Sequence, residues 1–390
     1  MVLFSTTSLA RDLRSDPVTG RVRVIYMGKI VGSPFPVLSQ EPLLSPTAVY
    51  ACTVTQDIGT IQRSVRNYMP RTYSRFLAND VVILCDANKQ AFRSDHFRWM
   101  KDGVLEDGQG LAMIGGAESF ADIGGYPSWK PTEVAEILPC EMMELGLTHS
   151  GGTIRILDPD DEFARSLPLD RIGAFGYFSS SNYIEPRTRA HLIAQLVKPM
   201  QTSPFLMWWD IGEGRTLAMS AGWQPVAGNI FMRWDYYGDY AINMMLFLAG
   251  QKLPDDLELV YLVRRRMREI NEGLSTIYSM VEMVEKFGGS AQSLNGMIID
   301  LQNQREEGRS FYFQADMDGA LQAFALAQEK LDDLMDETIR ARNSAALWIF
   351  VTEWAAVTGT ALLTGVAVWF LMVKRSLYHE VEITRLKPNE

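Results

Sequence analysis

DVVILCDAN at residues 80–88 and GLAMIGGAESF at residues 110–120 carry the strongest signal for the fold of this chain. Each contains a continuous apolar run, Asp80–Cys85 and Gly110–Ile114, of the kind found in parallel strands that helices cover on both faces. Between them, residues 94–101 have a helical pattern. Strand, helix and strand in this order predict two parallel neighbours in an α/β sheet.

Further strand patterns flank this pair on both sides. Residues 21–27 and 47–54 precede it and are rich in β-branched residues. The later candidates are strands at 153–157, 205–209 and 216–220 and a closing helix at 239–248. We therefore expect a short N-terminal segment, residues 1–20, and then a doubly wound α/β domain over residues 21–250, with a mostly parallel sheet and flavodoxin-like layering.

Ligands of such sheets bind beyond the carboxyl ends of the strands. This rule predicts a candidate ligand-binding crevice at Asp86, Gly115, Gly116, Glu118 and Ser119. We expect Gly115-Gly116 to form a strand-to-helix turn whose backbone N–H groups are open to an anion or a carbonyl oxygen. Asp86 and Glu118 are an acid–base pair in one interpretation. In the other, which we favour, they are turn formers or helix caps.

Longer motifs around these strands resemble a known family. They are DVVILCDAN and GLAMIGGAESF together with GGYPSWKPTEVAEILPCE at 124–141, GRTLAMSAGWQP at 214–225 and FMRWDYYGDYAINMMLFLAG at 231–250. This set resembles the glutamine-amidotransferase-like domains of membrane proteins, which are related to class I amidotransferases and to the trehalose-utilisation type. The resemblance covers about residues 20–250 and implies the same α/β fold.

The resemblance also implies where catalytic residues would lie. Class I amidotransferases place a cysteine on a sharp G-x-C-x-G turn and a histidine beside a glutamate after a later strand, because the thiolate needs a base. Here the turn reads Gly115-Gly116-Ala117-Glu118, and residues 221–225 read AGWQP where the family has His-Pro-Glu. We therefore predict no catalytic residue of the family type and expect ammonia transfer from glutamine to be absent.

Composition excludes several classes of function. Lys+Arg minus Asp+Glu is 37 − 47 = −10 and the isoelectric point is near 5.1, so no nucleic-acid partner is expected. Cys52, Cys85 and Cys140 form no CxxC pair, and the buried run around Cys85 predicts a structural thiol rather than a nucleophile. The histidines have no metal-ligand spacing. We predict no metal and no cofactor.

Three clusters of side chains have a functional and a structural interpretation, and we prefer the structural one for each. The acidic run 158–162 is a metal site or a turn that caps the next helix. Four arginines form a patch for anionic lipid or an acidic partner in the functional interpretation and a solvated helix face in the structural one. They are Arg264, Arg265, Arg266 and Arg268. Seven aromatic residues line a sugar or peptide pocket in the functional interpretation and pack in the hydrophobic core in the structural one. They are Trp208, Trp209, Trp223, Trp234, Tyr236, Tyr237 and Tyr240.

A helical stalk is expected over residues 255–343. Its first helix, 255–287, ends at Gly288-Gly289 and has apolar residues at alternating spacings of three and four, which is the a/d seam of a coiled coil. The seam consists of Val260, Val263, Met267, Ile270, Leu274, Ile277, Val281 and Val284. It must pack either on the next part of the same chain or on a second copy, and the short connection favours the same chain.

Residues 294–342 are expected to form a helical hairpin, with helices at 294–313 and 317–342. The second helix carries part of a pattern that resembles the latter half of a tetratricopeptide unit. The matching positions are Tyr312, Asp316, Ala320, Leu321, Phe324 and Ala327. Because the pattern occurs once, it indicates a hairpin rather than a repeat array.

Residues 344–373 are expected to form a transmembrane helix, followed by a short polar tail at 374–390. The segment contains an uncharged run, WAAVTGTALLTGVAVWFLMV at 354–373, which as a helix spans about 30 Å. Tryptophans lie toward its ends, and Lys374 and Arg375 follow. The first residues show no signal-peptide pattern, so we expect a single-pass cell-membrane protein with its α/β domain in the cytoplasm.

These expectations favour a non-catalytic, amidotransferase-like domain that serves as a binding or scaffolding subunit of a membrane-associated assembly. The partners would be the lipid bilayer and other protein subunits. One alternative is a hydrolase or small-molecule-modifying enzyme that uses Asp86, Glu118 or Ser119. Another is a purely structural subunit of a membrane complex.

Overall fold

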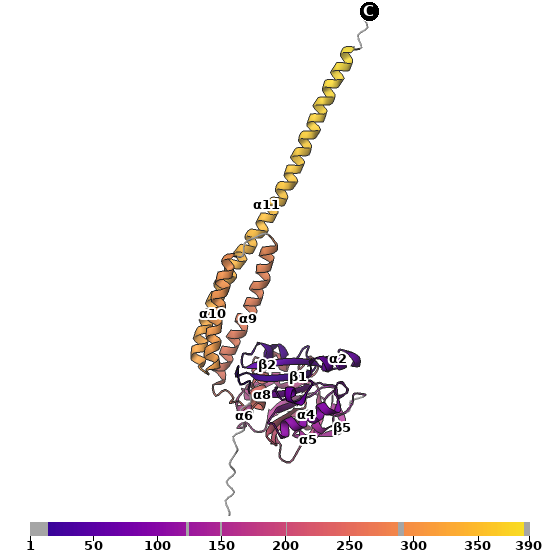
Figure 1. Cartoon of the computed structure of the whole chain (residues 1–390), viewed down its shortest axis with the longest axis vertical. Coiled ribbons are helices and arrows are strands. Elements are labelled where there is room, and N and C mark those ends of the chain that lie inside the picture. The colour runs from indigo at the N-terminus through magenta and orange to yellow at the C-terminus, as the bar shows by residue number, and fades with distance from the viewer. Residues whose placement is uncertain (1–14, 122–124, 149, 200, 288–291, 386–390) are drawn as a thin grey trace, which may run out of the picture. The chain divides into compact units, whose positions relative to one another are not determined.

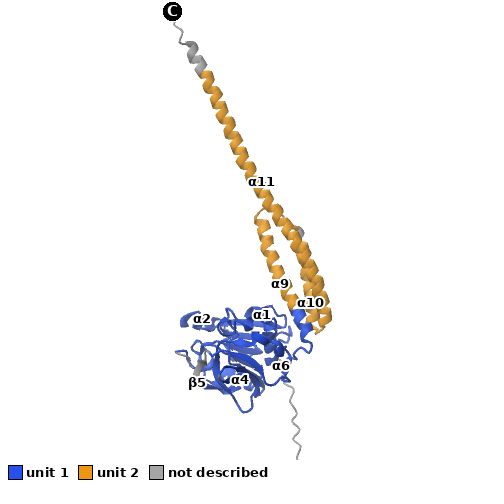
Figure 2. Cartoon of the chain, turned by 180° about the vertical axis from the view of Figure 1, so that it is seen from behind, with its two compact units in different colours: residues 1–264 blue, residues 265–390 orange. Residues whose placement is uncertain are grey.

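The structure is a computed structural model that describes residues 15–121, 125–148, 150–199, 201–287 and 292–385. The chain divides into two compact units, residues 1–264 and 265–390, which Figure 2 shows in blue and orange. Unit 1 holds an α/β domain and unit 2 is helical (Figure 1). The predicted fold class, α/β with a large sheet and a helical C-terminal region, is confirmed.

Unit 1 is built on a mixed nine-stranded sheet with the strand order β2-β1-β3-β4-β11-β10-β9-β6-β7. One half is parallel: β1 pairs with β2 and β3, β3 with β4, and β4 with β11. The strands of this half are β1 (Val22–Gly28), β2 (Leu44–Tyr50), β3 (Val81–Cys85), β4 (Gly110–Ile114) and β11 (Gly214–Met219).

The other half of the sheet is antiparallel, from β11 outward. Its strands are β10 (Thr202–Ile211), β9 (His191–Val197), β6 (Gly152–Ile156) and β7 (Tyr177–Phe178). A separate antiparallel pair consists of β5 (Cys140–Thr148) and β8 (Ser181–Pro186). β5, β7, β8 and β9 were not predicted from the sequence, because they lack the long apolar runs that identify buried parallel strands.

Helices cover both faces of the sheet. Alternate residues of each parallel strand enter opposite cores, as Val24 and Ile25 of β1 do. One core receives α1 (Phe35–Gln40), α6 (Glu162–Arg165) and α8 (Tyr237–Leu248). The other receives α2 (Ile58–Tyr68), α3 (Tyr73–Phe76), α4 (Ser94–Leu105) and α5 (Glu133–Ile137).

Short helical segments complete unit 1. α7 spans Pro225–Gly228 and follows β11. Single 3-10 turns lie at Lys89–Ala91, Leu169–Arg171, Gly173–Gly176 and Phe231–Arg233. The strand expected at 47–54 begins three residues earlier, at Leu44, because it pairs in register with the whole of β1.

Three long helices follow the sheet domain. They are α9 (Leu257–Lys286), α10 (Gln292–Phe313) and α11 (Met317–Arg385). These correspond to the helix expected over 255–287 and to the hairpin, whereas the stop expected at Gly288-Gly289 lies outside the described residues.

The seam of α9 is buried at all of its positions. Within unit 2 the partners come from the same chain. A Cβ placed at Gly273 would lie 2.5 Å from Leu331 Cδ2 of α11, so the glycine permits close helix packing. Gln302 of α10 donates a 2.6 Å hydrogen bond to the Tyr278 hydroxyl of α9. These residues of α9 therefore pack on the hairpin that follows in the same chain, as the preferred alternative has it.

Arg264 corrects one expectation. Its side chain is 1% exposed, whereas the arginine cluster was expected to lie on a solvated face. Within unit 1 its guanidinium lies 2.9 Å from Asp239 and 3.5 Å from Glu41, and it also donates to the Asn243 side-chain oxygen. The pairing with two acidic groups compensates for the loss of hydration of a buried charge. By contrast, Arg265 is exposed, as expected, and pairs with an acidic residue of the same helix.

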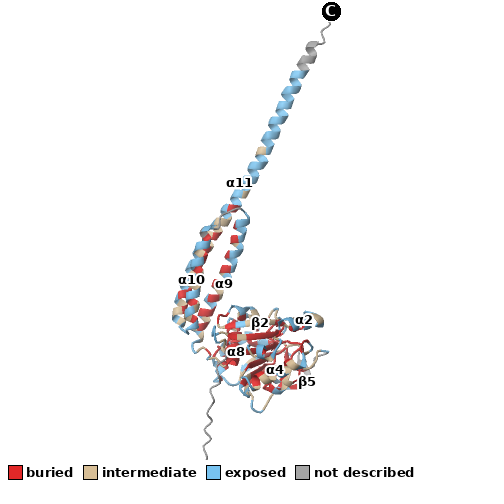
Figure 3. Cartoon of the chain, viewed as in Figure 1, coloured by how far each residue is buried: buried red, intermediate tan, exposed pale blue. Residues whose placement is uncertain are grey.

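One segment of α11 is long and apolar enough to cross a membrane. None of its most apolar window is buried, and Figure 3 shows this part of α11 as exposed. Trp354, Leu362 and Trp369 are 59–66% exposed. The core helix of a soluble domain buries such side chains, whereas no other described part of this chain covers them.

Candidate functional site

Asp86 lies directly after β3 in a strained backbone conformation. Its φ is 50°, which is uncommon for a residue other than glycine. The side chain is buried, and its Oδ1 accepts a 2.8 Å hydrogen bond from the backbone N–H of Glu118. The Asp86 N–H in turn donates to the Ser119 hydroxyl oxygen at 3.1 Å. These bonds join the ends of β3 and β4, which are adjacent in the sheet.

Glu118 is also buried, at 2% exposure. One carboxylate oxygen accepts a hydrogen bond from the Thr53 backbone N–H at 2.6 Å. The other accepts one from the Asn88 amide at 2.8 Å and one from the Thr53 hydroxyl. The Ser119 hydroxyl donates to the Ile114 carbonyl at 2.6 Å. The five predicted site residues are thus brought together, and each polar side chain among them is hydrogen-bonded within the domain.

Gly115 and Gly116 occupy positions where no side chain fits. A Cβ at Gly115 would lie 2.3 Å from the Ser220 carbonyl oxygen, and one at Gly116 would lie 2.3 Å from Asp86 Oδ1. The backbone N–H of Gly115 donates to Met219 and that of Gly116 to the Asn182 side chain. The prediction that these donors are open to a ligand is wrong, because the protein itself supplies both acceptors.

No helix follows Gly115-Gly116 directly in the described residues, and α5 begins only at Glu133. The turn was expected to lead into a helix. Trp129 contacts the residues that follow β3 and β4: its indole N–H donates to the carbonyls of Ala87 and Glu118, at 2.8 and 3.0 Å.

Asn182 is a site residue that the sequence did not indicate. Its amide accepts from the Gly116 N–H at 2.9 Å and donates to the carbonyls of Gly116 and Ser119, both at 3.1 Å. It belongs to β8, a short strand far away in the chain. No local pattern distinguishes this asparagine from one in a surface turn, so the contact had no signal in the sequence.

Burial and like charge shape the electrostatics of this site. Burial raises the pKa of Asp86 above its ordinary value, and the neighbouring Glu118 carboxylate acts in the same direction. The Cys52 thiol lies 3.8 Å from Asp86 Oδ2, and burial and the two carboxylates raise its pKa well above the usual range. A thiol in this environment stays protonated at neutral pH and is a poor nucleophile.

The segment after β11 contacts the end of β3. Gln224 Oε1 accepts from the Cys85 thiol at 3.3 Å, and the Trp223 indole N–H donates to Cys85 Sγ at 3.1 Å. Burial raises the pKa of Cys85 to about 12. This thiol is therefore a buried structural group, in agreement with the interpretation made from the sequence.

Besides Asn182, the sequence did not indicate a contact between Ser181 and Lys198. The Lys198 ammonium donates a 2.9 Å hydrogen bond to the Ser181 hydroxyl, and both residues are buried, at 5% and 1% exposure. Burial lowers the pKa of Lys198. A serine beside a lysine of lowered pKa is a known arrangement for nucleophilic catalysis.

The acidic run at 158–162 and most of the aromatic cluster have the structural roles that were expected, a helix cap and part of the core. Asp161 caps α6, because its Oδ1 accepts from the N–H groups of Phe163 and Ala164 and its Oδ2 from the Trp208 indole. In the described part of the chain, no three His, Cys, Asp or Glu side chains group as metal ligands would. Most of the aromatic cluster is core, with these members buried: Trp208, Trp223, Trp234, Tyr237 and Tyr240.

The chain is similar in structure to several solved proteins. Two are cytoplasmic proteins of Salmonella typhimurium. STM3548 is 18% identical, with 58% of this chain and 98% of that chain covered and a TM-score of 0.48. STM1381 of strain LT2 is 17% identical, with 58% and 99% covered and a TM-score of 0.46. The third, Gan42B, is a GH42 β-galactosidase from G. stearothermophilus, 11% identical, with 60% of this chain and 31% of that chain covered and a TM-score of 0.31.

No curated protein matches the sequence significantly. A family model does match: the GATase1-like model, described as "Putative glutamine amidotransferase", matches residues 55–250. The match includes β3, β4 and β11, whose ends form the site described above. Because it extends over half of the 390 residues, the chain belongs to the GATase1-like family of glutamine amidotransferase-like proteins.

Proposed function

We propose that the protein is a membrane-anchored, non-catalytic member of this family and serves as a binding or scaffolding subunit of a membrane-associated assembly. One observation carries the proposal: the polar side chains at the strand ends are buried, and each is hydrogen-bonded to a neighbouring part of the domain. Asp86 and Glu118 accept hydrogen bonds from neighbouring segments, and Ser119 donates to a backbone carbonyl. Groups held in this way support the fold rather than a reaction.

The cysteines support the same conclusion. Cys52, Cys85 and Cys140 are free and buried, and burial raises the pKa of each thiol. Glutamine hydrolysis by the family route requires a thiolate that is close to a base. The residues at 115–118 and 221–225 supply neither group.

The apolar segment of α11 supports membrane attachment. Its exposed leucine, valine and tryptophan side chains would otherwise contact water, which costs about 25 cal/mol for each Å². A bilayer removes this cost, and the segment is long enough to cross it. Free thiols are usual in reducing compartments, so we propose that the α/β domain lies on the cytoplasmic side.

A glutaminase assay tests the non-catalytic role. The full chain in a non-ionic detergent is incubated with glutamine and the release of glutamate is measured. We expect no release above that of the triple variant Cys52→Ala/Cys85→Ala/Cys140→Ala. Turnover in both proteins would contradict our account of the site, and turnover lost in the variant would show that one thiol is reactive.

The scaffolding role is tested by chemical crosslinking in native membranes. We expect adducts heavier than the 43.9 kDa chain. If only the monomer is recovered while a known complex in the same membranes is crosslinked, the scaffolding role is wrong.

The pair Ser181 and Lys198 favours a second candidate function, acyl transfer or hydrolysis. In such a reaction the neutral lysine amine would take the serine proton while Oγ attacks a carbonyl carbon, and the leaving group would then receive that proton. The low exposure of Ser181 disfavours this candidate. A fluorophosphonate probe decides between the two: we expect no labelling, whereas labelling that disappears in Ser181→Ala would establish a reactive serine.

A further inference from the structure

A cavity of about 340 Å³ lies in unit 1, away from the residues of the strand-end site. Its walls come from α2, from the segment after α2, and from the segment that leads into α4. The lining residues are Gln62, Val65, Arg66, Met69, Pro70, Arg71, Gln90, Ala91, Phe92, Arg93 and His96. The volume is at the lower end of the range of small-molecule sites, about 300–1,000 Å³.

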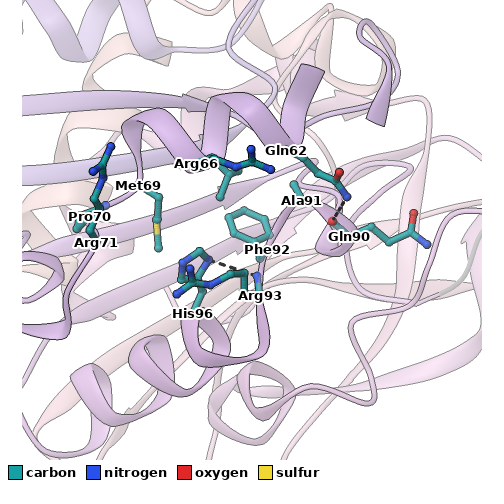
Figure 4. A pocket seen from close by; sticks show the side chains of 11 residues that line it. Gln62, Arg66, Met69, Pro70, Arg71, Gln90, Ala91, Phe92, Arg93 and His96 are labelled. Atoms are coloured by element: carbon teal, nitrogen blue, oxygen red, sulfur yellow. Dashed lines mark hydrogen bonds between the residues drawn. The ribbon is translucent and has the colours of Figure 1, made fainter. Parts of the chain in front are cut away.

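The cavity has an apolar floor. Val65, Met69, Ala91 and Phe92 are all buried, with Phe92 at 8% exposure. Figure 4 shows the Phe92 ring between the side chains of α2 and those that precede and begin α4. A floor of this composition suits the apolar or aromatic part of a ligand.

The rim of the cavity is cationic. Arg66, Arg71 and Arg93 line it and no acidic residue does, although the whole chain carries a net charge of −10. Arg93 is paired with Asp95 outside the lining. The guanidinium groups of Arg66 and Arg71 form no ion pair or hydrogen bond with any residue in the described ranges. Guanidinium groups of this kind bind carboxylates and phosphates in a bidentate manner.

His96 adds an oriented donor. Its Nδ1 accepts a hydrogen bond from the Arg93 backbone N–H at 3.4 Å, so a neutral imidazole carries its proton on Nε2. Burial lowers the pKa of His96, which keeps the ring neutral near pH 7. No described residue accepts a hydrogen bond from Nε2, which leaves that N–H for a ligand. The first turn of α4 lies here too, and its dipole favours an anion.

One hydrogen bond holds the two walls together. The Gln62 amide of α2 donates to the Gln90 carbonyl at 3.1 Å, across 28 residues of sequence, and Figure 4 shows it as a dashed line. This bond restrains the two walls relative to each other, and a restrained site loses less conformational entropy when a ligand binds.

We propose that this cavity binds a small organic oxyanion, a carboxylate or phosphate ester attached to an apolar or aromatic body. The body would lie on Phe92 and Met69, and the oxyanion would contact Arg66 and Arg71. None of the lining residues belongs to the strand-end site or to the apolar segment of α11, so the proposal does not depend on the role proposed above.

Isothermal titration calorimetry of the full chain in a non-ionic detergent tests the proposal. Phenyl phosphate and benzoate combine an oxyanion with a ring, whereas inorganic phosphate lacks the ring and benzyl alcohol lacks the charge. We expect saturable binding of at least one of the two combined probes, with a Kd below about 1 mM, and at least tenfold weaker binding of both partial probes.

The variant Arg66→Gln/Arg71→Gln should weaken binding of the combined probe at least tenfold. Arg63→Gln/Arg75→Gln is the matched control, because it removes the same charge from α2 and α3 outside the cavity and should leave the Kd unchanged. Both variants change exposed residues and should keep the wild-type melting temperature. The proposal is overturned if neither combined probe binds, if the cavity variant binds like wild type, or if the control loses affinity equally.

Discussion

At the scale of single residues, Asp86 shows how this site combines strain with burial. The residue adopts a left-handed conformation, which among L-residues asparagine and aspartate tolerate best. Its carboxylate is removed from water, which favours the neutral form. The hydrogen bond from the Glu118 N–H compensates for part of this cost.

The pH dependence of stability follows from the raised pKa of Asp86. A carboxyl group that binds its proton more tightly in the folded state stabilises the fold below the unfolded pKa, about 3.9. That contribution is lost as the pH rises through the folded pKa. Asp86→Asn lacks this contribution at every pH. Wild type therefore loses stability between pH 4 and pH 8 that the variant does not lose, and the difference in free energy of unfolding, variant minus wild type, should increase over this range. Fluorescence of the buried Trp129 and Trp223 during urea denaturation measures it.

Asp86→Ala is the matched comparison. It leaves the Glu118 N–H without its acceptor and places alanine in the left-handed conformation, so we expect a loss of about 1–3 kcal/mol at every pH. If Asp86→Asn keeps the wild-type pH dependence, the carboxyl group of Asp86 does not titrate in the way that its burial implies.

Gly116 permits a second prediction at this scale. In Gly116→Ala the new Cβ would lie 2.3–2.8 Å from three atoms of Asp86, so we expect a loss of about 1–3 kcal/mol from overpacking. Gly296→Ala is the control, because its Cβ meets nothing within 4 Å and alanine favours the helix α10. Thermal melting compares the two, and equal melting temperatures would show that the Asp86 side chain can move away without cost.

At the scale of elements, the buried seam of α9 stabilises the helical unit. Ile270 and Ile277 are fully buried, at 0% exposure, between helices that also bury Leu301, Phe324 and Leu334. Each side chain contributes about 1.5–3 kcal/mol by its removal from water. The sequence spacing that identified the seam therefore corresponds to packing within the chain, which the buried positions of α10 and α11 complete.

Ile270→Asp/Ile277→Asp should unfold the helical unit, because two unpaired carboxylates in an apolar seam cost several kcal/mol. Circular dichroism at 222 nm should show a large loss of thermal stability. Tryptophan fluorescence from Trp129 and Trp223 should change little, since those residues belong to the α/β domain.

Ser275→Asp/Ser279→Asp is the control on the same helix, where both positions are exposed, and it should melt within a few degrees of wild type. A wild-type melting curve for the double isoleucine variant would mean that the seam is not buried in solution.

At the scale of the whole molecule, the proposed membrane attachment rests on the apolar segment of α11. Leu362→Arg/Val366→Arg places two charges in its middle, at a cost of about 2.5–3.5 kcal/mol each in a bilayer. We expect wild type to remain in the membrane pellet after alkaline carbonate extraction and the variant to be released.

Gln322→Arg/Leu326→Arg adds the same charges with the same spacing to an exposed face of α11 outside the apolar segment. This control should stay in the pellet. Release of the control would show that charge alone solubilises the chain, and retention of Leu362→Arg/Val366→Arg would contradict a single spanning segment.

Features that depend on local pattern could be predicted from the sequence alone. Continuous apolar runs identified β3 and β4, because a strand buried on both faces needs apolar residues at every position. The three-and-four spacing identified the seam of α9, and length with hydropathy identified the apolar segment of α11. In each case, neighbouring residues carry the whole signal.

Which distant side chains meet became known from the folded structure. Asn182 bonds Gly116 across 66 residues, Lys198 bonds Ser181 from another strand, and the cavity beside His96 joins α2 to α4. Arg264 became buried because acidic groups from two distant segments of unit 1 surround it. Such contacts depend on the folded path of the chain between the partners, and no periodicity in the sequence encodes that path.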